Sequence, residues 1–213
     1  MARTTSSNTL PYGQADPLPV MEQFYTLQGE GAWAGTAAYF IRLAGCDVGC
    51  HWCDVKDSWT ATAEQYQPVS ALAAAAQASG TRRVVITGGE PSIYNLEPLC
   101  DALHAAGLVV HLETAGPHPY TGSIDWICFS PKKFLPPQDE YYQRAHELKV
   151  IIYHEHDLKW AETHAARCAP SVRLFLQPEW DRRTEMYPKV IDYIRTHPHW
   201  QLSIQTHKYL DIP

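Results

Sequence analysis

The sequence lacks the features that mark several common classes of protein. Lys and Arg total 17 residues against 23 Asp and Glu, so the formal net charge of the 213-residue chain is −6. Without a basic excess the chain has no overall field for the phosphate backbone of nucleic acids, and we expect no nucleic-acid partner. No apolar run is long enough to span a bilayer, so we also expect no membrane partner. These absences favour small-molecule chemistry.

The sequence also has no internal repeat, low-complexity tract or linker after residue 19, which predicts one domain over residues 20–213. Residues 1–19 are rich in Thr, Ser, Pro and Gly and lack the apolar core of a signal peptide, so a flexible tail is predicted there. Six cysteines without a signal peptide indicate a reducing compartment, the cytoplasm.

Three of the six cysteines stand close together in the sequence. Cys46, Cys50 and Cys53 follow the pattern C-x3-C-x2-C directly after an apolar run. A structural zinc site takes four ligands and is closed, whereas three cysteines on a cubane iron–sulfur cluster leave one iron open to an exchangeable ligand. Zinc completed by His51 or Asp54 would strain adjacent ligands, and a disulfide with a spare thiol would suit a secreted protein. The spacing therefore favours a 4Fe–4S cluster over these alternatives.

Strand-like and helix-like segments alternate along the chain. Apolar and β-branched runs predict strands over residues 38–43, 83–87, 108–112, 124–129, 148–153, 172–176 and 201–205. Helices are predicted over residues 70–79, 96–106, 157–168 and 187–194. Such alternation implies a parallel sheet, and the connections are too short for a complete eight-fold barrel. The predicted fold class is α/β, a partial barrel of about six parallel strands with a reduced set of helices.

Polar motifs follow five of the predicted strands at their C-terminal ends. They are the cysteine loop, Gly-Gly-Glu-Pro at 88–91, Glu-Thr-Ala-Gly at 113–116, Ser-Pro-Lys at 130–132 and Gln-Pro-Glu-Trp at 177–180. Active sites of α/β barrels and open sheets lie at this edge, so we expect one site. The paired glycines let a ligand approach the backbone, and the Glu90 carboxylate can accept from an ammonium group. On its own, however, Gly-Gly is also common in ordinary turns.

Two of these motifs together resemble the radical S-adenosylmethionine (SAM) superfamily. The cysteine motif carries an aromatic residue, Trp52, before its last cysteine, and Gly-Gly-Glu-Pro follows about 35 residues later. The sequence Gln-Gly-Glu-Gly at 28–31 further resembles the 7-carboxy-7-deazaguanine synthase family. That similarity runs over residues 20–213 and includes Arg42 and Gln-Thr-His-Lys at 205–208. The resemblance implies the same partial barrel.

The resemblance implies a carbon–nitrogen lyase that converts 6-carboxy-5,6,7,8-tetrahydropterin to 7-carboxy-7-deazaguanine, a precursor of queuosine and other 7-deazapurines. In this family a reduced 4Fe–4S cluster cleaves SAM, and the resulting 5′-deoxyadenosyl radical takes the C6 hydrogen of the pterin. The ring then contracts, ammonia is lost and SAM is re-formed. The protein supplies placement, shielding and electrostatics. A flavodoxin-like or ferredoxin-like electron donor and a homodimer are also implied.

By the same resemblance, roles are assigned by position. The cluster would be held by Cys46, Cys50 and Cys53. SAM would contact Trp52, Cys53, Asp54, Gly89, Ser130, Pro131, Lys132, Gln177 and Pro178. The substrate would contact Leu27, Gln28, Gly29, Arg42, Thr87 and Pro213. Arg42 suits the substrate carboxylate because a guanidinium binds a carboxylate bidentately, while Glu113 would lie on the polar rim with its partner unassigned.

One position departs from the family pattern. The residue two after the last cysteine is usually a Thr whose hydroxyl binds Mg²⁺, and here it is Val55. Mg²⁺ prefers oxygen ligands and keeps several waters, so the loss weakens the site, and Asp54, substrate or water would have to hold the ion. The sequence leaves the Mg²⁺ requirement open.

Two other functions fit part of these motifs. A glycyl-radical-enzyme activating enzyme shares the cysteine spacing but acts on a protein, whereas Gln-Gly-Glu-Gly and Arg42 favour a small carboxylated substrate. A redox-sensing iron–sulfur module without turnover would have no use for a SAM-binding Gly-Gly-Glu-Pro loop.

Overall fold

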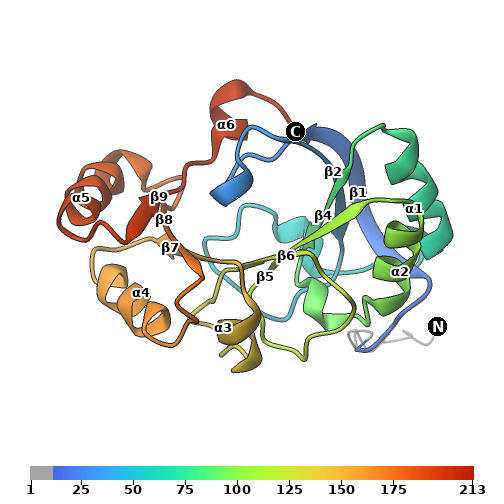
Figure 1. Ribbon diagram of the computed structural model, residues 1–213, viewed down its shortest axis with the longest axis horizontal. Coiled ribbons are helices and arrows are strands. Elements are labelled where there is room, and N and C mark those ends of the chain that lie inside the picture. The colour runs from blue at the N-terminus through green and yellow to red at the C-terminus, as the bar shows by residue number, and fades with distance from the viewer. Residues whose placement is uncertain (1–11) are drawn as a thin grey trace, which may run out of the picture.

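The computed structural model describes residues 12–213, which are built around a curved nine-stranded sheet (Figure 1). Neighbouring strands follow the order β3-β1-β2-β4-β5-β6-β7-β8-β9. The first and third strands are β1 (Leu18–Leu27) and β3 (Tyr66–Gln67), and their pairings are antiparallel. All later pairings are parallel, through β2 (Ala37–Leu43), β4 (Arg83–Gly88), β5 (Val109–Thr114), β6 (Trp126–Phe129), β7 (Glu147–Ile152), β8 (Arg173–Pro178) and β9 (Trp200–Leu202).

The outside of the curved sheet carries α1 (Val69–Ala78), α2 (Glu97–Ala105), α3 (Glu140–Arg144), α4 (Asp157–Ala165) and α5 (Arg183–Thr196) (Figure 1). The last helix, α6 (Thr206–Leu210), follows β9 and lies near the C-terminus (Figure 1). Short 3-10 turns are η1 (Gly31–Trp33), η2 (Lys56–Trp59), η3 (Ala63–Gln65) and η4 (Pro91–Ile93). Helices α1 and α2 pack on each other and α2 on β5, while α3, α4 and α5 cover β6, β7 and β8.

The predicted fold class is confirmed. Six parallel strands, β2 and β4 to β8, form most of an open barrel, and β9 adds only three residues. The predicted last strand at 201–205 is correspondingly shorter, because the chain leaves the sheet after Leu202 and enters α6 at Thr206.

Strand β1 is an element that the sequence pattern did not predict. It pairs with β2 along nearly its whole length, with an irregularity between Val20 and Glu22. Leu18 is fully buried, so the strand begins inside the segment predicted as a tail. Residues 1–11 of that predicted tail lie outside the described residues. Polar residues after Val20 remove the apolar alternation by which a half-buried strand is recognised.

Alternation along the strands separates an apolar outer face from an inner face that is polar on β5 and β7 and apolar on β2 and β4. Outward side chains such as Ile86, Leu112 and Leu148 belong to two buried apolar clusters that also contain helix residues. The intervening residues on β5 and β7 are polar: His111, Glu113, Glu147 and Lys149. Since successive side chains of a strand point to opposite faces, the covered outer face supplies the core and the inner face is left for chemistry. None of the helices within residues 12–213 is long and apolar enough to cross a membrane.

Candidate active site

A pocket of about 460 Å³ opens at the C-terminal edge of the parallel strands. All five polar loops predicted from the sequence contribute to its lining. The end of β1 and the C-terminal segment complete the wall. The expectation of one site at this edge is therefore matched by the placement of the motifs.

Most of the predicted contact residues line this pocket. Those predicted for the substrate all do so: Leu27, Gln28, Gly29, Arg42, Thr87 and Pro213. Of the residues predicted for SAM, those that line it are Trp52, Cys53, Asp54, Gly89, Ser130, Lys132 and Gln177. Pro131 lies instead against a small adjoining hollow, and Pro178 ends β8 between two residues that do line the pocket. The structure thus brings the two predicted sets to one cavity.

The cysteine loop is held in place by backbone hydrogen bonds. The amide of Gly45 donates to Ser58 O at 2.7 Å, and that of Cys46 donates to Trp59 O at 3.1 Å. The Glu90 amide donates to Gly45 O at 2.9 Å. A Cβ added to Gly89 would lie 2.2 Å from Gly45 O, so only glycine lets the Gly-Gly-Glu-Pro loop pack this closely on the cysteine loop.

The three cysteines of this loop fit an iron–sulfur cluster. Cys46, Cys50 and Cys53 are free thiols that line the pocket. Three thiolates suit a cubane cluster, which leaves one iron open, better than a structural zinc ion, which takes four ligands. Burial raises the pKa of Cys46, and that of Cys50 to about 11, so cluster binding has to displace their protons.

The Glu90 carboxylate joins two of the loops that form the pocket. Its oxygens accept from the Ser92 amide at 2.9 Å, from the Ala115 amide at 2.8 Å and from the Thr114 hydroxyl. From the sequence we expected the Glu90 carboxylate to accept from an ammonium group of a ligand. Such a group would have to share the Glu90 oxygens with these three protein donors. Glu90 therefore fixes the Glu-Thr-Ala-Gly loop against the Gly-Gly-Glu-Pro loop.

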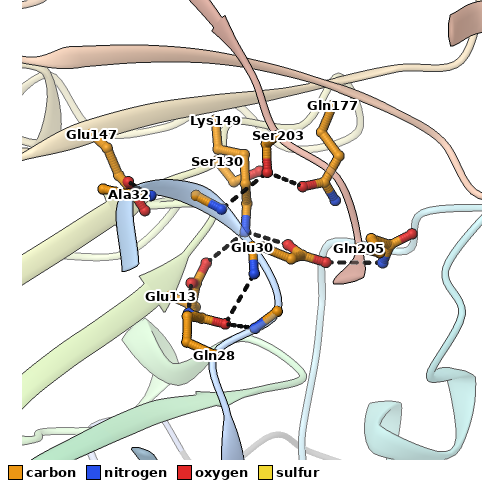
Figure 2. Close-up of polar contacts among 12 residues, drawn as sticks. Gln28, Glu30, Ala32, Glu113, Ser130, Glu147, Lys149, Gln177, Ser203 and Gln205 are labelled. Atoms are coloured by element: carbon orange, nitrogen blue, oxygen red, sulfur yellow. Dashed lines mark hydrogen bonds and ion pairs between the residues drawn. The ribbon is translucent and has the colours of Figure 1, made fainter. Parts of the chain in front are cut away.

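A buried lysine, Lys149, also lines the pocket, and Figure 2 shows the polar side chains around it. The Lys149 ammonium lies 2.5 Å from Glu30 Oε2 and 2.9 Å from Glu113 Oε2. Gln28 Nε2 donates to Glu113 Oε1 at 3.0 Å, and Gln205 Nε2 donates to Glu30 Oε1 at 2.9 Å. The partner of Glu113 that the sequence left unassigned is thus Lys149 together with Gln28.

Charge pairing outweighs burial in this group. Burial alone would lower the pKa of Lys149, but the carboxylates of Glu113 and Glu30 raise it well above its ordinary value. Burial likewise opposes ionisation of both carboxyls, yet Lys149 lowers the pKa of each. One ammonium between two carboxylates leaves one net negative charge facing the pocket.

The Gln-Gly-Glu-Gly loop is fastened to strands and to the C-terminal segment (Figure 2). The Gly31 amide donates to Ser203 Oγ at 3.0 Å, and the Ala32 amide to Glu147 Oε2 at 2.7 Å. The amide and hydroxyl of Thr206 donate to Gly29 O at 2.9 and 2.8 Å. These bonds close the gap between the β1 end and the β9 end of the open barrel.

Three basic side chains, Arg42, Lys132 and Lys208, line the pocket. Arg42 Nε pairs with Glu22 Oε1 at 2.6 Å while the residue lines the pocket. Lys132 Nζ donates to both oxygens of Ser130, at 2.5 and 2.6 Å. Lys208 Nζ pairs with Asp54 Oδ2 at 2.6 Å and so ties α6 to the cysteine loop.

Comparison with known proteins identifies the family. The Radical SAM superfamily model matches residues 40–154. A 7-carboxy-7-deazaguanine synthase of Flavobacterium psychrophilum is 50% identical over 94% of this chain and 95% of its own, and one of Synechocystis sp. is 50% identical over 91% and 93%. The chain belongs to the 7-carboxy-7-deazaguanine synthase family. A crystal structure of QueE from Escherichia coli superposes with a TM-score of 0.81 at 31% identity, covering 89% of this chain and 94% of that one.

The residue at position 55 of this chain, Val55, does not fit a Mg²⁺ site. Its aliphatic side chain offers no ligand, and the neighbouring Asp54 carboxylate is already paired with the Lys208 ammonium. Another group of three possible ligands comprises His111, Glu113 and Glu147. His111 and Glu147 are buried, Glu113 is half-buried and pairs with Lys149, and the group includes an imidazole, whereas Mg²⁺ prefers oxygens and retained waters.

Several pocket residues were given no role from the sequence. Lys149 was missed altogether, whereas Glu30, His207 and Lys208 belong to the motifs at 28–31 and 205–208, but their contacts with Lys149, Gly29 and Asp54 were not predicted. A signal was available for Lys149, because a strand with apolar residues at alternate positions carries a charge between them. The pairings of the other three join segments far apart in the chain, which no local pattern reveals.

Proposed function

We propose that this chain converts 6-carboxy-5,6,7,8-tetrahydropterin to 7-carboxy-7-deazaguanine with loss of ammonia, as a radical SAM lyase of 7-deazapurine biosynthesis. One observation carries the proposal: the three free cysteines and the Gln-Gly-Glu-Gly loop line the same pocket. A site that joins a cluster motif to a charged small-molecule cradle suits a small polar substrate, not a protein segment.

The cofactors follow from the lining of the cysteine side. Cys46, Cys50 and Cys53 would hold a 4Fe–4S cluster, leaving one iron open. SAM would lie beside it, against the residues Trp52, Asp54, Gly89, Ser130, Lys132 and Gln177. When bound, cluster and SAM together supply the one-electron chemistry that removes a hydrogen atom from the substrate. The apolar wall of Val48, Trp52 and Trp59 would keep water from the reacting atoms.

The substrate would be oriented by charge at both of its ends. The Arg42 guanidinium would bind the substrate carboxylate. Glu22 engages the Nε of Arg42, so the substrate would use the two terminal nitrogens. The donor-rich pyrimidine end of the pterin would face Gln28 and the net negative trio of Glu30, Glu113 and Lys149. Leu27, Gly29, Thr87 and Pro213 would then complete the cradle by contact.

The reaction would also need an electron donor and a suitable compartment. A flavodoxin-like or ferredoxin-like protein would deliver the electron, and a homodimer would be the working assembly. Six free thiols suit the reducing cytoplasm. Because Val55 offers no oxygen, the reaction would depend little on Mg²⁺.

Anaerobic incubation of the cluster-loaded protein with SAM, a reductant and the carboxylated pterin tests the proposal. We expect a product with the mass and absorbance of 7-carboxy-7-deazaguanine, together with ammonia. SAM cleavage without a deazapurine, accompanied by a radical on an added glycyl-radical enzyme, would instead assign the chain to the activating enzymes.

A further inference from the structure

A single hydroxyl connects two walls of the pocket. Ser203 follows β9 and is 2% exposed. Its Oγ donates to Gln177 Oε1 at 2.7 Å and accepts from the Gly31 amide at 3.0 Å (Figure 2). The two partners lie on β8 and in the Gln-Gly-Glu-Gly loop, so Ser203 joins segments that are distant in the chain.

The direction of these bonds fixes which atoms face the ligands. A backbone N–H can only donate, so Ser203 Oγ accepts from Gly31 and its own proton is free to reach Gln177. With its oxygen engaged, Gln177 presents its amide nitrogen to the pocket that it lines. If the Gln177 amide were flipped so that it donated to Ser203 Oγ, the buried Ser203 proton would lose this partner, which is costly.

The Gly31 end of this connection has little freedom to adjust. Gly31 has φ +63, and a Cβ there would lie 2.5 Å from Glu147 Oε1. The flanking residues are held as well, Glu30 by Lys149 and Ala32 by Glu147. A shift of Ser203 would therefore be transmitted to the loop, because the loop cannot absorb it locally.

We propose that Ser203 is a positioning residue that couples SAM binding to substrate binding. This inference rests on the proposed function, which places SAM against Gln177 and the pterin against Gln28 and Gly29. A ligand that shifts Gln177 shifts Ser203, and Ser203 passes the shift to the loop that receives the other ligand. Such coupling is reciprocal, so each ligand raises the affinity for the other by the same factor.

Anaerobic calorimetry on the cluster-loaded protein, without reductant so that SAM stays intact, measures this factor. SAM is titrated with and without the carboxylated pterin, and the pterin with and without SAM. We expect each ligand to improve the affinity for the other about fivefold or more in the native chain. Ser203→Ala should bring both factors close to one, while Ser79→Ala, a serine at the end of α1, should leave them unchanged.

A matched pair of variants separates the hydroxyl from packing. Ser203→Thr and Ser203→Val have nearly the same shape, and thermal melting shows whether each is folded. Coupling retained in Ser203→Thr and lost in Ser203→Val supports the proposal. Equal coupling in the native chain, Ser203→Ala and Ser203→Val overturns it, as does a factor of one in the native chain. Failure of the native chain to bind either ligand would instead overturn the proposed function.

Discussion

The two walls of the pocket are built in different ways. The cysteine side, residues 45–59 with the Gly-Gly-Glu-Pro loop, is held by backbone hydrogen bonds and by the close approach of Gly89. The lysine side, Lys149 with Glu30 and Glu113, is held by side-chain charges brought from three separate segments. A wall built from neighbouring residues can be recognised in the sequence as a motif. A wall built from charged residues of three distant segments shows in the sequence only as isolated single residues.

The largest expected effect breaks the cysteine side. Cys50→Ala should abolish SAM cleavage and lower bound iron from about four per chain, because two cysteines cannot hold the open cubane. Cys100→Ala, in the buried apolar cluster, should leave the cluster intact. Iron analysis and electron paramagnetic resonance check both variants. Full activity in Cys50→Ala would show that the cluster is held elsewhere.

A second change breaks the lysine side. Lys149→Met leaves two buried carboxylates without their cation, and we expect a loss of about 3–5 kcal/mol of unfolding free energy at pH 7. Urea denaturation measures it. Lys189→Met, which removes an exposed lysine paired with Glu185 and Glu155, should change the stability little.

The stability of Lys149→Met should also depend on pH differently from that of the native chain. In the native chain Lys149 lowers the pKa of Glu30 and Glu113, so their contribution to stability is present above the unfolded pKa, about 4.5, and is lost as pH falls through the lowered folded pKa. Without Lys149, burial raises both values, and protonation relieves the variant as pH falls. The stability gap between the two proteins should narrow from pH 7 towards pH 5. A constant gap would mean that Lys149 acts by packing alone.

A third change tests Arg42, which pairs with Glu22 and lines the pocket. Arg42→Lys should weaken pterin binding about tenfold, because one charge-assisted hydrogen bond of the fork is lost. SAM cleavage without substrate should change little. Arg83→Lys, which alters a guanidinium stacked on Trp33 away from the pocket lining, is the matched control. Weaker SAM binding with unchanged pterin binding would contradict the role given to Arg42.

The smallest expected effect concerns Val55. Turnover of the native chain should rise little with Mg²⁺ concentration, and Val55→Thr should respond more steeply because it supplies a hydroxyl oxygen. Steady-state rates over a range of Mg²⁺ concentrations check this. Strict Mg²⁺ dependence of the native chain would show that other oxygens complete a site.

The contrast between the two walls also explains what the sequence could predict. The parallel strands were recognisable because their apolar outer faces repeat, and the cysteine side because its spacing is local. Strand β1 escaped because polar residues follow Val20, and α6 because five residues make too short a periodic pattern. The ion pairs of Lys149 depend on which strands become neighbours, and only the fold determines that.

The most direct test of the proposed reaction measures where the C6 hydrogen of the substrate goes. The carboxylated pterin is prepared with deuterium at C6 and incubated anaerobically with the reduced, cluster-loaded protein and SAM. We expect deuterium in the recovered SAM or 5′-deoxyadenosine, and 7-carboxy-7-deazaguanine as the product. A deazapurine formed without any transfer of deuterium to the adenosyl group, or no deazapurine at all, would contradict the proposed reaction.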